Sequence, residues 1–96
     1  MKRDDAIRAI RPRLPELRRL GVVSLSLFGS TARDDASETS DVDILVTFEG
    51  PPSFNHFMDA KFILEDALGQ TVDLATPSGL KPQFRPIIER EAIRVA

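Results

Sequence analysis

The sequence predicts an α/β domain in which helices pack on one small mixed β-sheet. Three observations predict this class: an amphipathic helical period near the N-terminus, two strand-like runs after it, and a second helical stretch before a third short apolar run. Helical and strand-like segments therefore alternate along the chain. At 96 residues the chain is long enough for one modest core, so we expect a single domain over residues 1–96.

The first helix is predicted over residues 4–20, where apolar side chains recur at three- and four-residue steps. Pro12 and Pro15 interrupt this stretch. Either the helix bends there, or a second short helix begins near Pro15, where a proline in the first turn is tolerated. Gly21 is expected to end the helical region.

The elements after Gly21 follow from alternation, β-branched content and turn residues. Residues 23–28 alternate apolar with small polar residues, which indicates a strand with one buried face, and residues 42–48 are apolar enough for a central strand. The other predicted elements are a helical turn at 31–33, a helix from Ser53 or Asn55 to Leu68, a strand at 72–75, a loop at 76–79, a helix at 83–91 and a short edge strand at Ile93 and Val95.

Two apolar sets are assigned to the core. The first lies on the predicted helix that ends at Leu68 and consists of Phe57, Phe62, Leu64 and Leu68. The second consists of Phe84, Ile87 and Ile88, which fit either a core position or a surface that docks a partner; core is the favoured interpretation.

Composition and charge exclude several classes of function. No apolar run approaches the length of a membrane span, and the N-terminus lacks a secretory signal, so we expect a cytoplasmic protein with no membrane association. The chain has no cysteine, which excludes disulfides and thiolate metal sites. Its net charge is −2 and no aromatic residues interleave with the basic ones, so direct nucleic-acid binding is not expected.

Asp41 and Asp43 are the first candidate site residues. Side chains alternate faces along a strand, so these two carboxylates project to the same side, about 6.6 to 7 Å apart along the strand. Such carboxylates repel each other unless a cation neutralises them, and Mg²⁺ is the divalent ion that pairs with oxygen ligands and substrate phosphates. Asp41 merely capping a turn is the simpler alternative.

Gly29 and Ser30 form the other half of the candidate site. They stand where the strand at 23–28 ends and a helical turn follows. Glycine allows a ligand to approach the backbone closely, and N–H groups at a helix start, together with a serine hydroxyl, bind anions. Ser30 as an ordinary helix cap uses the same geometry. A phosphate cradle that faces carboxylates is the equipment for phosphoryl or nucleotidyl transfer.

Asp73 is the candidate for a third carboxylate. It lies between Val72 and Leu74 in the predicted strand at 72–75, and pairing of this strand beside residues 42–48 would bring it to the same face. There it could help to hold metal and accept a proton from an attacking hydroxyl. A solvated acid on an edge strand is the alternative for Asp73 considered alone.

These residues resemble a known family. Gly29-Ser30-Thr31-Ala32-Arg33, then Ser40-Asp41-Val42-Asp43 before an apolar run, and Asp73 in Val-Asp-Leu are similar to the minimal nucleotidyltransferases of the DNA polymerase beta superfamily. The resemblance covers nearly the whole chain. One departure is Asp34, where many relatives carry glycine.

The resemblance implies an activity, a cofactor and a partner. It implies the polymerase beta-like fold, and an antitoxin that transfers AMP from ATP to a tyrosine of a HEPN-domain RNase toxin, with Mg²⁺ required. Gly29 and Ser30 would hold the triphosphate, Asp41, Asp43 and Asp73 the metal, and Asp73 would be the base. Arg33 is expected either to contact phosphate or to pair with an acid of its own loop. A non-catalytic antitoxin that neutralises the toxin by binding alone is the alternative.

Overall fold

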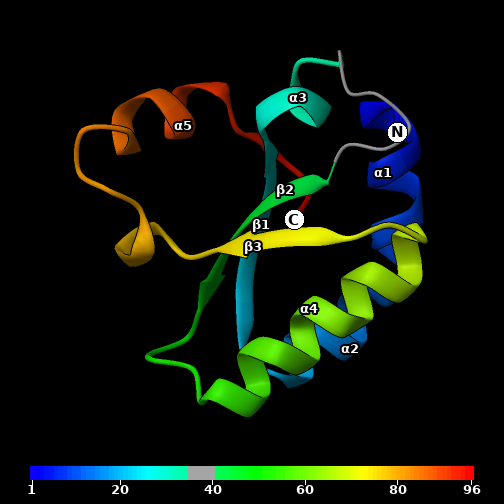
Figure 1. The fold of residues 1–96 in the computed structure, drawn as a ribbon. Helices are drawn as coiled ribbons and strands as arrows, with labels where there is room; N and C mark the ends of the chain where they lie inside the picture. The colour runs from blue at the N-terminus through cyan, green and yellow to red at the C-terminus, as the bar shows by residue number, and fades with distance from the viewer. Residues whose placement is uncertain (35–40) are drawn as a thin grey trace.

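The computed structural model describes residues 1–34 and 41–96, so Ser40 of the predicted motif lies outside the described residues. Helices and strands alternate in the described ranges, as the sequence predicts (Figure 1). In chain order the elements are α1 (Arg3–Ile10), the 3-10 turn η1 (Arg11–Arg13), α2 (Leu14–Arg19), β1 (Val22–Phe28), α3 (Gly29–Ala32), β2 (Val42–Phe48), α4 (Phe54–Leu68), β3 (Val72–Ala75), the 3-10 turn η2 (Pro77–Gly79), α5 (Arg85–Glu91) and β4 (Ile93–Arg94).

The strands form one mixed sheet in the order β3-β2-β1-β4. β1 pairs antiparallel with both β2 and β4, whereas β2 and β3, joined through α4, pair in parallel. β2 is thus a central strand, as predicted, and β3 is an edge strand. Figure 1 shows α1, α2 and α4 together on one side of the sheet and α5 on the other. The mixed sheet with its helices confirms the predicted fold class.

The core lies between the sheet and the layer of α1, α2 and α4. Alternate residues of the strands point into it and are almost completely buried, as are residues from one stripe of each helix. Burial of this apolar surface is the main term that stabilises the fold. The largest fully buried apolar side chains are Ile10, Leu17, Leu25, Leu27, Ile44, Leu64, Val42, Val46 and Val72.

The ends of the helices follow from local chemistry. The prolines divide the N-terminal helical region, and the second helix begins at Leu14 with Pro15 in its first turn, which is the second of the two predicted alternatives. Ser53, rather than Asn55, caps α4: its Oγ accepts a hydrogen bond of 3.1 Å from the backbone N–H of His56. Gly69 ends the helix in the left-handed region at φ 66°.

Val23 and Phe62 depart from the expected burial. The register between β1 and β2 shifts between Val22 and Ser24, and this bulge places Val22 in the core while Val23 is 58% exposed. Phe62 is 55% exposed because the core stripe of α4 runs through Ala60, Leu64 and Leu68. Phe62 stands half a helical turn from Ala60 and faces away from the core.

The C-terminal region corrects two further expectations. Phe84 and Ile87 are 50% and 51% exposed, so their assignment to the core is wrong; α5 contacts α3 and β1 on the side of the sheet opposite the main helical layer. Residues 77–79 form a 3-10 turn where only a loop was expected. The predicted edge strand is present as β4. No helix in the described ranges is long and apolar enough to cross a membrane.

Candidate functional site

The pairing of β2 with β3 brings two of the predicted carboxylates together. In this parallel register Asp43 stands directly opposite Asp73, followed by Leu45 opposite Ala75 two residues further on. Opposite residues share one face of a sheet, and here it is the face turned away from the core, because the alternate residues Val42 and Ile44 are buried. The side-chain direction expected for Asp73 is the observed one.

Gly29 lies against the same carboxyl group. β1 runs antiparallel to β2 and its last residue, Phe28, pairs with Asp43, so the chain enters α3 directly beside that side chain. Gly29 has φ +68°, a conformation that favours glycine. A Cβ at Gly29 would collide with the Asp43 carboxyl oxygen and approach its carboxyl carbon to 3.2 Å. The backbone can therefore contact Asp43 only because residue 29 has no side chain.

The electrostatics of Asp43 reflect this crowding. Partial burial, the charge of Asp73 and a hydrogen bond between the two carboxyl groups, with a smaller contribution from Asp41, raise the pKa of Asp43 to about 6, against a small opposing effect of Arg33. Asp41 is exposed at the entry to β2. Within the described residues, no group of three or more acidic, histidine or cysteine side chains is arranged as a complete metal cage. The structure thus joins Asp43 and Asp73 directly and leaves Asp41 in electrostatic reach.

Carboxylate oxygens are the ligand type that Mg²⁺ prefers, and the pair that Asp43 and Asp73 form suits such an ion. Burial and the neighbouring charge of Asp73 make the ionised form of Asp43 less favourable, which is why its pKa is raised. A divalent cation held by both carboxylates would offset this cost. The residues present therefore fit the metal that the sequence pattern suggested.

Comparison with known proteins decides the family. The model of the nucleotidyltransferase domain family matches residues 7–95. The chain belongs to this family. A protein of Thermococcus cleftensis named protein adenylyltransferase MntA is 46% identical over 81 residues, which are 83% of this chain and 82% of that protein. A solved structure described as a minimal nucleotidyltransferase is similar with a TM-score of 0.84 and 36% identity, over 97% of this chain and 95% of the other.

A more distant structural likeness concerns the fold of this nucleotidyltransferase domain. The crystal structure of a toxin–antitoxin with AMP-PNP contains a chain that superposes with a TM-score of 0.70 at 19% identity, covering 100% of this chain and 73% of that one. At this identity the likeness extends to the fold alone.

Ser30 and Arg33 stand in or next to the short helix α3. Ser30 lies inside the first turn, and the cap position belongs to Phe28, which makes no side-chain cap bond, so Ser30 is not an ordinary N-cap. Arg33 Nη1 lies 3.2 Å from Glu91 Oε2. This partner comes from α5, 58 residues away. The two expected roles of Arg33, contact with phosphate or pairing with an acid of its own loop, stay predictions, because residues 35–40 of that loop lie outside the described residues. No local pattern could have indicated Glu91.

The backbone conformation at residue 34 explains how an aspartate can stand where the family pattern has glycine. Its φ of +62° is in the left-handed region, where glycine is favoured and aspartate is one of the more tolerated alternatives. The Asp34 carboxylate accepts a hydrogen bond of 2.9 Å from the backbone N–H of Arg3 at the start of α1. An aspartate therefore keeps the backbone conformation expected of glycine and adds a tie to the first helix.

Proposed function

We propose that this nucleotidyltransferase domain transfers AMP from ATP to a tyrosine hydroxyl of a HEPN-domain RNase toxin and thereby neutralises it. The observation that carries the proposal is the direct opposition of Asp43 and Asp73 beside the close backbone approach at Gly29. The relative named protein adenylyltransferase MntA supports AMP transfer. The choice of a toxin partner and of ATP follows the family resemblance of the sequence, and the toxin–antitoxin structure with AMP-PNP shares the fold of this chain.

The proposed site divides into a metal-binding and a phosphate-binding part. Asp41, Asp43 and Asp73 would hold Mg²⁺, which when bound would stabilise the charge that develops on the phosphate oxygens. The backbone N–H groups at Gly29 and Ser30, with the Ser30 hydroxyl, would bind the β- and γ-phosphates, and Arg33 would add a positive charge beside them. The carboxylates and the anion-binding backbone thus act on opposite ends of the same triphosphate.

In the proposed reaction the acceptor oxygen attacks the α-phosphorus of ATP. A new bond forms between them, the bond to the bridging oxygen of the β-phosphate breaks, and pyrophosphate leaves. Asp73 accepts the hydroxyl proton, for which its exposed position on the edge strand is suited because an acceptor can approach it from outside the sheet. These 96 residues contain no tyrosine, so a tyrosine acceptor lies outside them.

The test is transfer of labelled AMP to the cognate HEPN protein in the presence of ATP and Mg²⁺. We expect label on a toxin tyrosine with the wild-type chain and none with the Asp41→Asn and Asp43→Asn double variant. Replacement of the acceptor tyrosine by phenylalanine should also abolish labelling. Label that persists in the double variant would contradict the proposal.

A second candidate is an antitoxin that neutralises the toxin by binding alone. The exposed apolar side chains of Phe84 and Ile87 on α5 favour it, because they offer a surface for a protein partner. This alternative requires the Asp41→Asn and Asp43→Asn double variant to silence the toxin as well as the wild type does. Catalytic neutralisation requires the same variant to fail while it still binds the toxin.

A further inference from the structure

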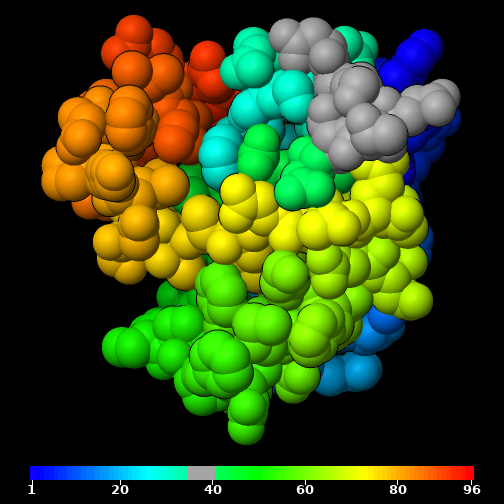
Figure 2. All heavy atoms as spheres, in the orientation of Figure 1, coloured from blue at the N-terminus to red at the C-terminus, as the bar shows by residue number. Residues whose placement is uncertain are grey.

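A pocket of about 630 Å³ lies at the edge of the sheet, between η2, in orange in Figure 2, and the green segment that leads into α4. β3 stops at Ala75, opposite Leu45, whereas β2 continues to Phe48. Residues 46–48 therefore have no partner strand on this side among the described residues, and all three line the pocket. The pocket borders the part of β2 that β3 leaves uncovered.

Pro77 ends the pairing of β3 with β2. The hydrogen bond of 3.0 Å from Val42 N–H to Thr71 C=O shows that the even-numbered residues of β2 turn their backbone groups toward β3. By the same alternation, residue 77 is the next one that would donate an N–H to β2, and proline has none. The chain turns there into η2. Phe48 is the last even-numbered residue of β2, so its N–H and C=O point toward the uncovered edge.

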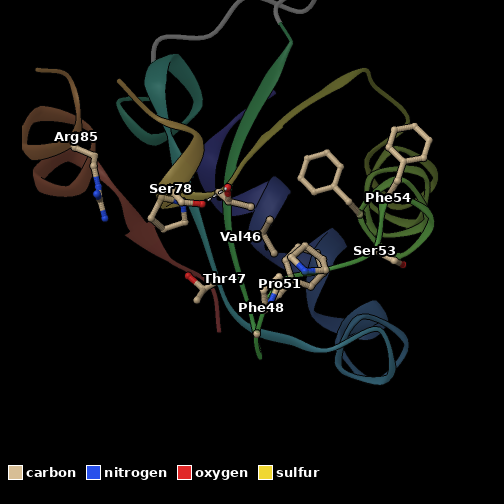
Figure 3. Close-up of a pocket in the computed structure, with 13 residues that line it drawn as sticks. Val46, Thr47, Phe48, Pro51, Ser53, Phe54, Ser78 and Arg85 are labelled. Carbon is tan, nitrogen blue, oxygen red and sulfur yellow. Dashed lines mark hydrogen bonds between the residues drawn. The ribbon is translucent and has the colours of Figure 1, made fainter. Parts of the chain in front are cut away.

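The two halves of the pocket lie on opposite sides of the sheet and differ in chemistry. The half on the side that α4 covers is aromatic: the ring centroids of Phe48 and Phe57 are 6.3 Å apart, and Phe54, at the start of α4, is 77% exposed. The half on the opposite side carries Thr47 and Arg85, the first residue of α5. Figure 3 shows Phe54 and Arg85 on opposite sides of β2. None of the described residues that line the pocket is acidic.

An extended peptide fits both the uncovered edge and the two-sided lining. Successive side chains of a strand point to opposite faces of a sheet, so an added strand sends one side chain to the phenylalanines and the next to Arg85. The aromatic half suits an apolar side chain. The other half suits an acidic one, because Arg85 is exposed and its ion pair with Glu89, at 3.6 Å, is a weak one. Charge complementarity thus selects a peptide in which apolar and acidic residues alternate.

We propose that this edge of β2 binds an extended segment of another protein in which an acidic residue stands between two apolar ones. The backbone of Phe48 supplies the hydrogen bonds, Phe54 and its aromatic neighbours bind the apolar side chains, and Arg85 binds the acidic one. The inference goes beyond the proposed function and does not depend on it, since no candidate site residue lines the pocket.

The probe is the acetylated and amidated pentapeptide Val-Glu-Val-Glu-Val, titrated by NMR into the full chain without nucleotide or metal. Binding should be saturable and should slow hydrogen exchange of the Phe48 amide, which donates to the added strand. We expect Arg85→Glu to bind this peptide about tenfold more weakly and to prefer the matched peptide Val-Lys-Val-Lys-Val. Phe54→Ala should weaken binding about tenfold, as for loss of an aromatic anchor. Arg90→Glu and Phe62→Ala are the matched controls, because they change exposed residues of the same two helices that do not line the pocket.

Three results would overturn the inference. The first is the absence of saturable binding by the wild type. The second is binding that leaves hydrogen exchange of the Phe48 amide unchanged, since the peptide would then not extend the sheet. The third is equal affinity of the wild type, Arg85→Glu and Phe54→Ala for the glutamate peptide, with amide spectra that show both variants to be folded.

Sedimentation of the chain alone tests a second copy as the occupant of this edge. We expect a monomer at every concentration that the titration uses. Dimerisation that rises with concentration and is abolished by Phe54→Ala would assign the edge to self-association and overturn the inference. Because neither experiment contains ATP, both outcomes are independent of AMP transfer, and failure of the proposed function would leave them unchanged.

Discussion

Asp43 and Asp73 face each other directly across two parallel strands, although 29 residues separate them in the chain. Burial, the charge of Asp73 and a side-chain hydrogen bond with Asp73 together raise the pKa of Asp43 to about 6. Two acids in such a position are unfavourable for the metal-free protein at neutral pH. Their placement is therefore better explained by a ligand than by stability.

Asp43→Asn is expected to stabilise the metal-free protein at pH 7.5. Because the folded-state pKa of Asp43 rises from 3.8 to about 6, the folded state binds the proton more tightly, and wild-type stability falls as pH rises through that window. For a fully buried group, a pKa shift of this size would lower the free energy of unfolding by about 3 kcal/mol. Asp43 is half-buried, and solvent screening reduces this loss to about 1 kcal/mol. Thermal unfolding in EDTA should place the variant about 4 to 8 °C above the wild type. The difference should disappear near pH 4, and a constant difference from pH 4 to 7.5 would contradict this origin.

With Mg²⁺ bound, the wild type is expected to be more stable than Asp43→Asn. Binding of the ion to the native carboxylates stabilises the wild type by about 1.4 kcal/mol at ten times the dissociation constant, whereas Asp43→Asn has lost a ligand. Unfolding temperatures measured at increasing Mg²⁺ concentration should rise for the wild type alone. The effect should weaken below pH 6, because protons compete with the metal for Asp43. An equal response of both proteins would place the metal elsewhere.

Gly29→Ala is expected to slow AMP transfer strongly. Gly69→Ala is its matched control, because the φ angles at the two positions are 68° and 66° but a Cβ at Gly69 meets nothing within 4 Å. Both variants should lose about 1 to 2 kcal/mol of stability from the left-handed backbone alone. Only Gly29→Ala also displaces the Asp43 carboxyl, and its transfer rate should fall about 100-fold, the scale of losing a preorganised contact. Similar rates for the two variants would show that the contact with Asp43 is unimportant.

The pair formed by Arg33 and Glu91 allows a test of the role of Arg33. Both side chains are partly exposed, so the ion pair should contribute less than about 1 kcal/mol to stability. If Arg33 contacts the phosphates, Arg33→Ala should weaken binding of a non-hydrolysable ATP analogue by about tenfold. Glu91→Gln keeps the arginine and should not weaken this binding. Calorimetric titration of the two variants compares them directly. Equal weakening by both variants would indicate that the pair acts only by joining α3 to α5.

The sequence predicted the elements whose signals are local. The β-branched run of β2 and the caps of α4 at Ser53 and Gly69 depend on neighbouring residues, and the structure confirms them. The opposition of Asp43 and Asp73 could be expected once β3 was placed beside β2. The bulge at Val22 and the ion pair of Arg33 with Glu91 depend on pairing between distant segments, which no local period encodes. Phe84 and Ile87 show the same limit, because their exposure depends on which layer α5 joins.

The most direct test of the central claim is calorimetric titration of the wild-type chain with a non-hydrolysable ATP analogue, with and without Mg²⁺. If Asp43 and Asp73 hold the ion that bridges the protein to the phosphates, binding should require Mg²⁺ and should disappear in both Asp43→Asn and Asp73→Asn. Binding that is independent of Mg²⁺, or that survives in both variants, would contradict the account.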